Sequence, residues 1–401
     1  MSVEPVRRVL LVDDEAALLN GLKKALRPYR DRWQVDTALG GAEALAAIDR
    51  GGFDVIVSDA RMPQIDGEQV LRHALKTRPT AVRVVLSGQV DAKTGHRLAS
   101  LAHQFLAKPS PGAAIIAAIE ECCRVSDALG DPKLIALVGT MGALPVAPET
   151  YHRISALIDS PSAAMEEVSQ IVSENVAVAT TLLKLVGSAY FGLQRGVTSV
   201  RDAVVLLGLE AVREIVLLTE VLREPDGLGL LEELQRRAIF RSRLTRLVGG
   251  KSPTVVLASE AALLADVGVY SFALQMPARY RQVWERHLAE RRALREVELE
   301  AFGFDSDRVG AALLRIWKLP ETVVTAVATG HRQPSPDAVT DAASVLALTT
   351  QLEDEVLGLT RAHQPGGLER LAAQLGLSVR VPQLREEAAR AWSNIGTEER
   401  R

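Results

Sequence analysis

Cysteine is almost missing from this chain, and the two that occur, Cys122 and Cys123, are neighbours in the sequence. Adjacent cysteines rarely meet the spacing and orientation that a disulfide needs, so we expect no disulfide framework. A chain without disulfides is suited to a reducing compartment, and we therefore expect a cytoplasmic protein.

Long apolar runs are missing as well. No stretch approaches the roughly 20 apolar residues that span a bilayer, and the first residues lack the apolar core of a signal peptide. The formal net charge is only -3, which gives no general attraction to nucleic acid or to anionic membranes. We expect neither as a partner.

Aromatic residues are scarce, at 4% of the 401 residues, whereas Ala and Leu are abundant. This balance favours helix over sheet for most of the length. The length itself suits two or three domains.

The first 127 residues are different, because short β-branched runs alternate there with helical segments. This alternation predicts a parallel sheet with helices on both faces, whose functional groups lie at the carboxyl ends of the strands. The expected strands are 8–12, 33–37, 55–59, 82–87 and 104–108, and the expected helices include 16–27, 41–50 and 112–124.

After Asp127 the strand signals nearly vanish, and the Gly, Asp and Pro of ALGDPK (128–133) indicate a boundary. Amphipathic helical patterns follow. Because its charges of both signs are evenly mixed, 285–302 is expected to be one exposed helix. The other predicted helices are 149–159, 163–173, 175–188, 200–222, 231–248, 255–267, 307–317 and 321–330.

Acids, a hydroxyl and a lysine stand where the predicted strands end. Asp13 and Asp14 follow the first strand, Asp59 and Ser87 end two others, and Lys108 ends the last. These positions converge on one edge of a parallel sheet. Packed carboxylates repel one another unless a cation lies among them, and oxygen ligands are those that Mg²⁺ prefers. Such a set is suited to accepting a phosphoryl group.

VDDE, SDARMPQIDG, SG and AKP occur in an order and at a spacing that resemble the receiver domain of bacterial response regulators, over residues 7–125. The resemblance implies a flavodoxin-like fold and assigns Asp59 as the phospho-acceptor of a histidine kinase. It also implies that Asp13, Asp14, Asp59 and the backbone carbonyl of Arg61 hold Mg²⁺.

The same resemblance assigns Ser87 and Lys108 to contacts with the phosphoryl group, and Phe105 to the aromatic switch position, where Tyr is commoner. Asp66 fits a helix N-cap better than a metal ligand. The alternative is a pseudo-receiver whose strand-end acids never receive a phosphoryl group.

The segment 139–332 resembles the HDOD family, a helical relative of HD-type phosphohydrolases, through LVGSAYFGLQRGVTSVRDAVVLLGL, ALLADVGV and GFDSDRVGAALLRIWKLP. Active HD enzymes place a His directly before the metal-binding Asp. Here Ala265 precedes Asp266, and Ser306 stands where the family often has His. Asp266 and His331 alone remain, too few to hold a catalytic metal, so we expect no cofactor in this domain.

Asp266 lies in an apolar run and must be satisfied locally if it is buried. Two local roles are open: capping a helix, or pairing with an arginine such as Arg241. Arg241 belongs to a cluster with Arg236, Arg237, Arg243 and Arg246. We expect that cluster to be a solvated face or to pair with acids such as Glu232 and Glu233; the alternative is an anion-binding site.

The sequence therefore predicts an α/β flavodoxin-like doubly wound receiver (1–127), a linker (128–138), an all-α HDOD domain (139–335) and a C-terminal helical extension (336–401). We expect a non-catalytic response regulator whose partners are a sensor histidine kinase and an unidentified signalling protein. Family resemblance adds cyclic di-GMP turnover as a candidate pathway, and a homodimer is left open. The rival functions are a receiver-controlled phosphohydrolase and a DNA-binding transcriptional regulator.

Overall fold

A computed structural model gives the fold of the chain. It describes residues 6–87, 98, 101–108, 110–140, 154, 157–158, 165–187, 199–209, 212, 216, 230–249, 253–317, 319–329, 341–359 and 366–398.

The N-terminal part is a parallel five-stranded sheet in the order β2-β1-β3-β4-β5. This is the doubly wound arrangement that the alternating pattern predicts, so the predicted α/β class is confirmed. The strands are β1 (Arg7–Asp13), β2 (Trp33–Leu39), β3 (Val55–Asp59), β4 (Val82–Ser87) and β5 (Gln104–Ala107).

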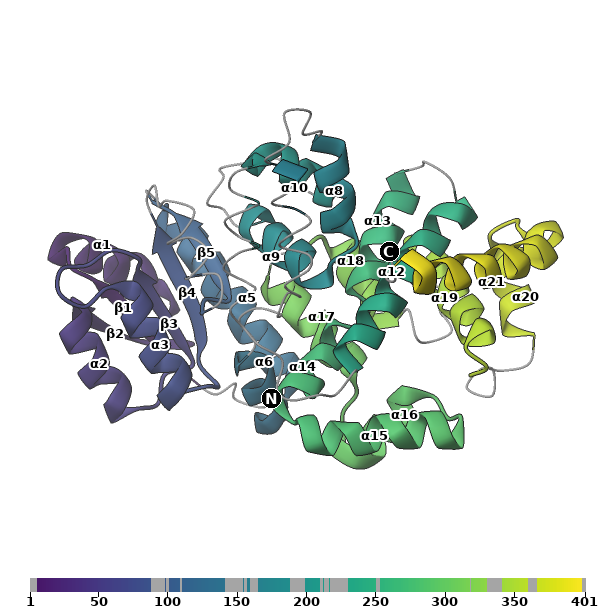
Figure 1. Ribbon diagram of the computed structural model, residues 1–401. Helices are drawn as coiled ribbons and strands as arrows, with labels where there is room; N and C mark the ends of the chain where they lie inside the picture. The colour runs from purple at the N-terminus through teal and green to yellow at the C-terminus, as the bar shows by residue number, and fades with distance from the viewer. Residues whose placement is uncertain are drawn as a thin grey trace.

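Helices cover both faces of this sheet (Figure 1). Successive strand side chains point to opposite faces, and β1 from Val9 onward and all of β3 are buried on both faces. Val9 and Leu11 of β1 pack with α1 (Ala16–Leu26) and α5 (Gly112–Leu129). Leu10 and Val12 pack on the other side with α2 (Gly41–Arg50) and α3 (Gly67–Thr77).

The rest of the described chain is helical, and it extends from α5 through α6 to α21 at the far end of the molecule (Figure 1). Its first helices are α6 (Pro132–Thr140), α8 (Met165–Ser173), α9 (Val176–Gly187), α10 (Val200–Leu207), α12 (Leu230–Gly249), α13 (Pro253–Leu264) and α14 (Val267–Gln275). They are followed by α15 (Pro277–Glu290), α16 (Leu294–Phe302), α17 (Ser306–Ile316), α18 (Glu321–Thr329), α19 (Asp341–Val356), α20 (Gly367–Gln374) and α21 (Val381–Glu398).

Helix α17 is central to the helical part, and it contacts α14, α18, α5 and α6. It begins at the N-cap Asp305, whose side chain accepts a hydrogen bond from the backbone of Arg308. Its backbone approaches α14 closely: a Cβ at Gly268 would lie 1.9 Å from the carbonyl oxygen of Ser306. Only glycine permits this approach.

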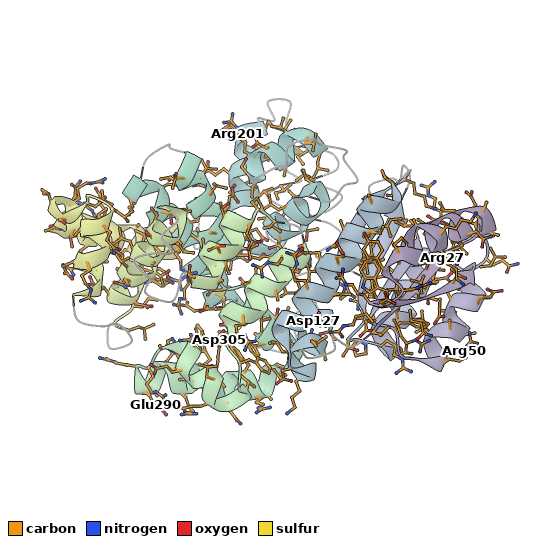
Figure 2. The ribbon with its side chains drawn as sticks, turned by 180° about the vertical axis from the view of Figure 1, so that it is seen from behind. Arg27, Arg50, Asp127, Arg201, Glu290 and Asp305 are labelled. Atoms are coloured by element: carbon orange, nitrogen blue, oxygen red, sulfur yellow. The ribbon has the colours of Figure 1, made fainter. Side chains whose placement is uncertain are left out.

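One apolar core runs from the sheet into the helices. Leu71 of α3 and Val85 of β4 belong to the same buried cluster as Val125 of α5, Leu134 of α6 and Val309 of α17. The predicted linker 128–138 thus contains most of α6, and α5 and α6 are separated only by Gly130 and Asp131. Figure 2 shows Asp127 between the sheet and the helical body.

Two predictions about helices were wrong in detail. The segment 285–302 is two helices, α15 and α16, that separate near Arg291, a non-glycine residue with a φ of 51°. It is also not wholly exposed, because Glu298 is fully buried. The predicted helix 200–222 breaks at Gly208, whose φ of 79° ends α10.

The expectation that no stretch approaches the length of a membrane span was wrong: the segment Thr254–Gln275 is long and apolar enough by length and composition, but 89% of its most apolar window is buried inside the protein. It comprises α13 and α14, which are packed among other helices. This burial fits the core of a soluble domain rather than a lipid-facing span.

Candidate functional site

The three predicted carboxylates of the sheet edge lie together. Asp13 ends β1, Asp14 follows it, and Asp59 ends β3; one oxygen of each lies within 4.8 Å of the others. Asp13 and Asp59 are buried, whereas Asp14 is exposed. An oxygen-only set with one open side fits a hard divalent cation such as Mg²⁺, which keeps part of its water shell.

Lys108 completes this acidic cluster from the end of β5. Its Nζ lies 2.7 Å from Asp13 Oδ2 and 3.0 Å from Asp59 Oδ2. Burial lowers the pKa of Lys108, but hydrogen bonds to Asp13 and Asp59 outweigh it and raise the pKa above its ordinary value. The ammonium is therefore fixed as a cation beside Asp59.

Two opposing effects act on the pKa of Asp59. Burial raises its pKa above the ordinary value, while the hydrogen bond and charge of Lys108 oppose that rise. The backbone N–H of Arg61 also donates to this carboxylate. A partly desolvated carboxylate beside a fixed cation is suited to nucleophilic attack on phosphorus.

The loop after β3 is held by local interactions that the sequence indicates. Asp66 is the N-cap of α3, and its side chain forms a capping box with Gln69, so the predicted capping role is confirmed. Gly67 follows, and a Cβ there would lie 2.0 Å from the carbonyl oxygen of Asp59. The glycine therefore lets α3 start directly against the residue that carries the carboxylate.

The backbone positions of two further predicted residues agree with a shared edge. Ser87 ends β4 and pairs with Ala107 of β5, next to Lys108, and Phe105 pairs with Val85. The side chains of Ser87 and Phe105 lie outside the described part of the structure. The role of the Arg61 carbonyl as a metal ligand stays a prediction.

In the helical domain, Asp266 lies between α13 and α14 and is 4% exposed. Its carboxylate accepts a hydrogen bond of 2.9 Å from Nη2 of Arg241 on α12, which is fully buried. Pairing with Arg241, one of the two roles expected for Asp266, is thus confirmed. The other role is wrong: Asp266 is the N-cap residue of α14, but its side chain makes no capping bond.

A second carboxylate, Glu353 of α19, holds the same arginine. Its oxygens accept bonds of 2.6 Å from Nε of Arg241 and 2.7 Å from Nε of Arg237. Asp354 lies 3.6 Å from Nη2 of Arg237. We refer to Arg237, Arg241, Asp266, Glu353 and Asp354 as the buried ion cluster.

The buried ion cluster corrects the expected solvated face, because Arg237 and Arg241 point into the core. Of the outer arginines, Arg236 lies 3.8 Å from the predicted partner Glu233, and Arg243 pairs with Glu174 instead. Sequence reasoning missed Glu353. The signal that could have found it is the run of three acids, Glu353, Asp354 and Glu355, inside the apolar pattern of 341–356.

Within the described residues, the three sheet-edge aspartates are the one group of His, Cys, Asp or Glu side chains placed to hold a metal ion. Ser306 faces another partner: its backbone N–H and hydroxyl both donate to Glu298 at 2.8 Å. His331 lies outside the described residues.

Two family models match the chain. The response regulator receiver domain matches residues 9–120, and the HDOD domain matches residues 144–333. Receiver domains generally bind Mg²⁺ through an acidic cluster, here Asp13, Asp14 and Asp59.

Two curated relatives match part of the chain. Transcriptional regulatory protein TrcR of Mycobacterium tuberculosis is 37% identical over 128 residues, or 31% of this chain and 48% of TrcR. An uncharacterized protein of Treponema pallidum is 27% identical over 198 residues, covering 48% of this chain and 38% of the relative. The chain spans at most about half the length of these curated relatives.

Among solved structures, the MmoQ response regulator of Methylococcus capsulatus is similar over 61% of this chain and 98% of its own, with a TM-score of 0.50 and 25% identity. A virulence factor of Campylobacter jejuni covers 63% of this chain and 97% of its own, with a TM-score of 0.51. At 16% identity, that second likeness shows the fold alone.

Proposed function

Because a receiver domain is followed by an HDOD domain, we propose that this chain is a two-component response regulator in which phosphorylation of Asp59 switches the helical domain between two states. The observation that supports this most directly is the contact of Lys108 with both Asp13 and Asp59. An acceptor carboxylate, further acids to hold a metal ion and a fixed ammonium are the groups that phosphoryl transfer to an aspartate needs.

In the proposed reaction, an oxygen of Asp59 attacks the phosphorus of a phosphohistidine on the sensor kinase. The new P–O bond forms as the P–N bond breaks, and the imidazole leaves. Mg²⁺ held by Asp13, Asp14, Asp59 and the Arg61 carbonyl would neutralise charge on the phosphoryl oxygens. Lys108 would turn toward the transferred group, and Ser87 and Phe105 would respond to it.

The test is phosphate uptake from a small phosphodonor in Mg²⁺ by the full chain and by Asp59→Asn. We expect wild type to be labelled and Asp59→Asn to remain unlabelled. Asp49→Asn, on the exposed side of α2, is the matched control and should be labelled like wild type. Equal labelling of Asp59→Asn and wild type would reject the assignment.

We also propose that the helical domain is not a hydrolase. The support is the pairing of Asp266 with Arg241: a guanidinium already neutralises the carboxylate that an HD enzyme would offer to a metal. Purified protein is expected to hold no stoichiometric transition metal in this domain and to leave phosphodiesters intact. One bound Zn, Fe, Ni or Mn per chain with hydrolysis that chelators abolish would establish the rival enzyme.

The output of such a regulator would be recruitment of a signalling protein in the cytoplasm, with cyclic di-GMP turnover as one candidate pathway. Full-length protein would be used as bait for partner proteins, once with Mg²⁺ and beryllofluoride, a phosphoryl mimic, and once unloaded.

The similarity to TrcR gives no support to DNA binding by the helical domain, since it covers only 31% of this chain. Salt-sensitive binding to duplex DNA would support the alternative of a DNA-binding transcriptional regulator.

For the domain division, we propose that residues 1–127 form the input unit and 139–335 the HDOD unit, with 128–138 joining them. The extension 336–401 would be an integral part of the HDOD core. Phe240 and Leu244 of α12 support this, because they are buried against Leu348 and Leu352 of α19.

A further inference from the structure

Arg83, the second residue of β4, is a fully buried cation without a carboxylate partner in the described residues. Its Nε donates to the carbonyl oxygen of Leu101 at 2.6 Å, and Nη1 to that of Ala81 at 3.1 Å. Nη2 donates to the carbonyl oxygen of Gly139, 56 residues away on α6, at 2.6 Å. Burial lowers the pKa of Arg83 to about 9, so the side chain remains protonated at neutral pH.

The neighbouring imidazole does not replace the Gly139 acceptor. His103 Nδ1 accepts a hydrogen bond of 2.9 Å from the backbone N–H of Arg83, so a neutral ring carries its proton on Nε2. That Nε2 lies 3.4 Å from Nη2 of Arg83, where two donors would face each other. Within the described residues, Nη2 is therefore satisfied by Gly139 alone.

The end of α6 is fitted to this position. Gly139 is the penultimate residue of α6, and helix carbonyls in the last turn carry partial negative charge that favours a cation. A Cβ at Gly139 would lie 1.9 Å from the carbonyl oxygen of Pro79, in the loop before β4. The backbone of α6 thus rests directly on the receiver domain, and α6 also contacts α14 and α17 of the helical domain.

The strand that carries Arg83 leads to the phosphorylation site. β4 ends at Ser87, four residues later, and β5 pairs with β4 from Gln104 onward. The backbone N–H of His103, just before β5, also donates to the carbonyl oxygen of Arg83 at 2.7 Å. Arg83 and the strand ends of the phosphorylation site therefore belong to the same hydrogen-bonded pair of strands.

We propose that the bond between Arg83 and Gly139 is the latch that couples the phosphorylation site to the helical domain, closed in the unphosphorylated chain and weakened when Asp59 carries a phosphoryl group. The inference rests on the proposed function of Asp59. When the latch opens, Nε and Nη1 of Arg83 keep their carbonyl acceptors, but Nη2 is left buried without one unless α6 moves to admit water. Coupling is reciprocal: if loading weakens the latch, the latch weakens loading by the same factor.

The first measurement is hydrogen exchange of the α6 amides (133–140) in the full chain, with and without Mg²⁺ and beryllofluoride. We expect exchange to become faster by at least about fivefold on loading, the lower end of usual allosteric coupling. Binding of the mimic is followed separately by ¹⁹F NMR. Saturation with unchanged α6 exchange would overturn the latch and leave the phospho-acceptor standing, whereas no binding to wild type would remove the proposed function itself.

The second measurement uses Arg83→Met, which removes the latch. The variant is expected to reach half-saturation at a beryllofluoride concentration at least about fivefold lower than wild type. Arg72→Met, an exposed arginine of the same domain, is the matched control and should bind like wild type. Equal half-saturation of Arg83→Met and wild type would reject the inference. If Arg83→Met does not fold, Arg83→Lys takes its place, and the wild-type exchange experiment remains decisive.

Discussion

Nε of Arg241 on α12 donates a hydrogen bond of 2.6 Å to Glu353 on α19, and both side chains are fully buried. The two residues are 112 positions apart, and Glu353 lies beyond residue 333, where the HDOD match ends. The helical extension therefore supplies a charge that the core of the matched domain requires. Two arginines share this one carboxylate.

Glu353→Ala should be strongly destabilising, because it leaves Arg237 and Arg241 with too little negative charge inside the core. Removing one partner of a buried pair costs about 3–5 kcal/mol in the free energy of unfolding. Denaturant unfolding followed by circular dichroism measures the loss. Glu386→Ala, at an exposed position of α21, is the control and should change stability by less than about 0.5 kcal/mol. Equal stability of both variants would contradict the role of the buried ion cluster.

A chain that ends at residue 340 should not form a stable helical domain. It loses Glu353 and uncovers Phe240 and Leu244, which α19 buries in the full chain. We expect aggregation, or loss of a cooperative unfolding transition, in gel filtration and calorimetry. A soluble, cooperatively folding truncation would show instead that the extension is dispensable.

Stability should fall as the pH rises from about 5 to 8. Burial raises the pKa of Glu298 from 4.5 to about 7, and hydrogen bonds from Tyr280 and Ser306 do not cancel the rise. The folded protein therefore binds this proton more tightly than the unfolded chain does. The contribution is present below pH 4.5 and is lost as the pH passes about 7, up to roughly 3 kcal/mol.

Glu298→Gln checks this origin, since a neutral amide of similar shape does not titrate. The slope of unfolding free energy against pH should become flatter than in wild type. Part of the slope should persist, because burial also raises the pKa of Glu260 to about 7. An unchanged slope in Glu298→Gln would assign the pH dependence to other groups.

Gly67→Ala should impair phosphorylation of Asp59. The added methyl would lie 2.0 Å from the Asp59 carbonyl oxygen, so the start of α3 or the acceptor residue must shift. We expect slower labelling by a small phosphodonor and a lower melting temperature of the receiver. Gly21→Ala is the matched control: no atom lies within 4 Å of its new Cβ in α1, and it should stabilise the helix by about 0.5–1 kcal/mol.

The sequence predicted the receiver well because its signals are local. Strand 55–59 and helix 41–50 appear with the predicted bounds, since β-branched runs and turn residues mark their ends. The edge where Asp13 and Asp59 meet followed from parallel topology alone.

The helical domain was harder to predict because its decisive contacts are distant in sequence. The partner Arg241 of Asp266 could be inferred, since a buried carboxylate needs a cation. Glu353 was missed, because the acids inside the apolar pattern of 341–356 indicate a buried charge but do not identify α12 as its partner. The break at Arg291 has no glycine or proline to mark it. Glu298 is buried, and the hydrogen bonds that its carboxylate accepts come from Tyr280 and Ser306 on neighbouring helices.

The apolar core passes without interruption from β4 through α5 and α6 to α17. It therefore limits where the chain can be divided into separately folding parts. A receiver cut at residue 120, the limit of its family match, would lose Val125 and Leu129 of α5, which share one buried apolar cluster with Leu71 and Val85. The smallest portable module is therefore the sheet together with α5 and α6. A chimera that exchanges receivers between regulators of this type should join the two parents after residue 140, beyond the end of α6.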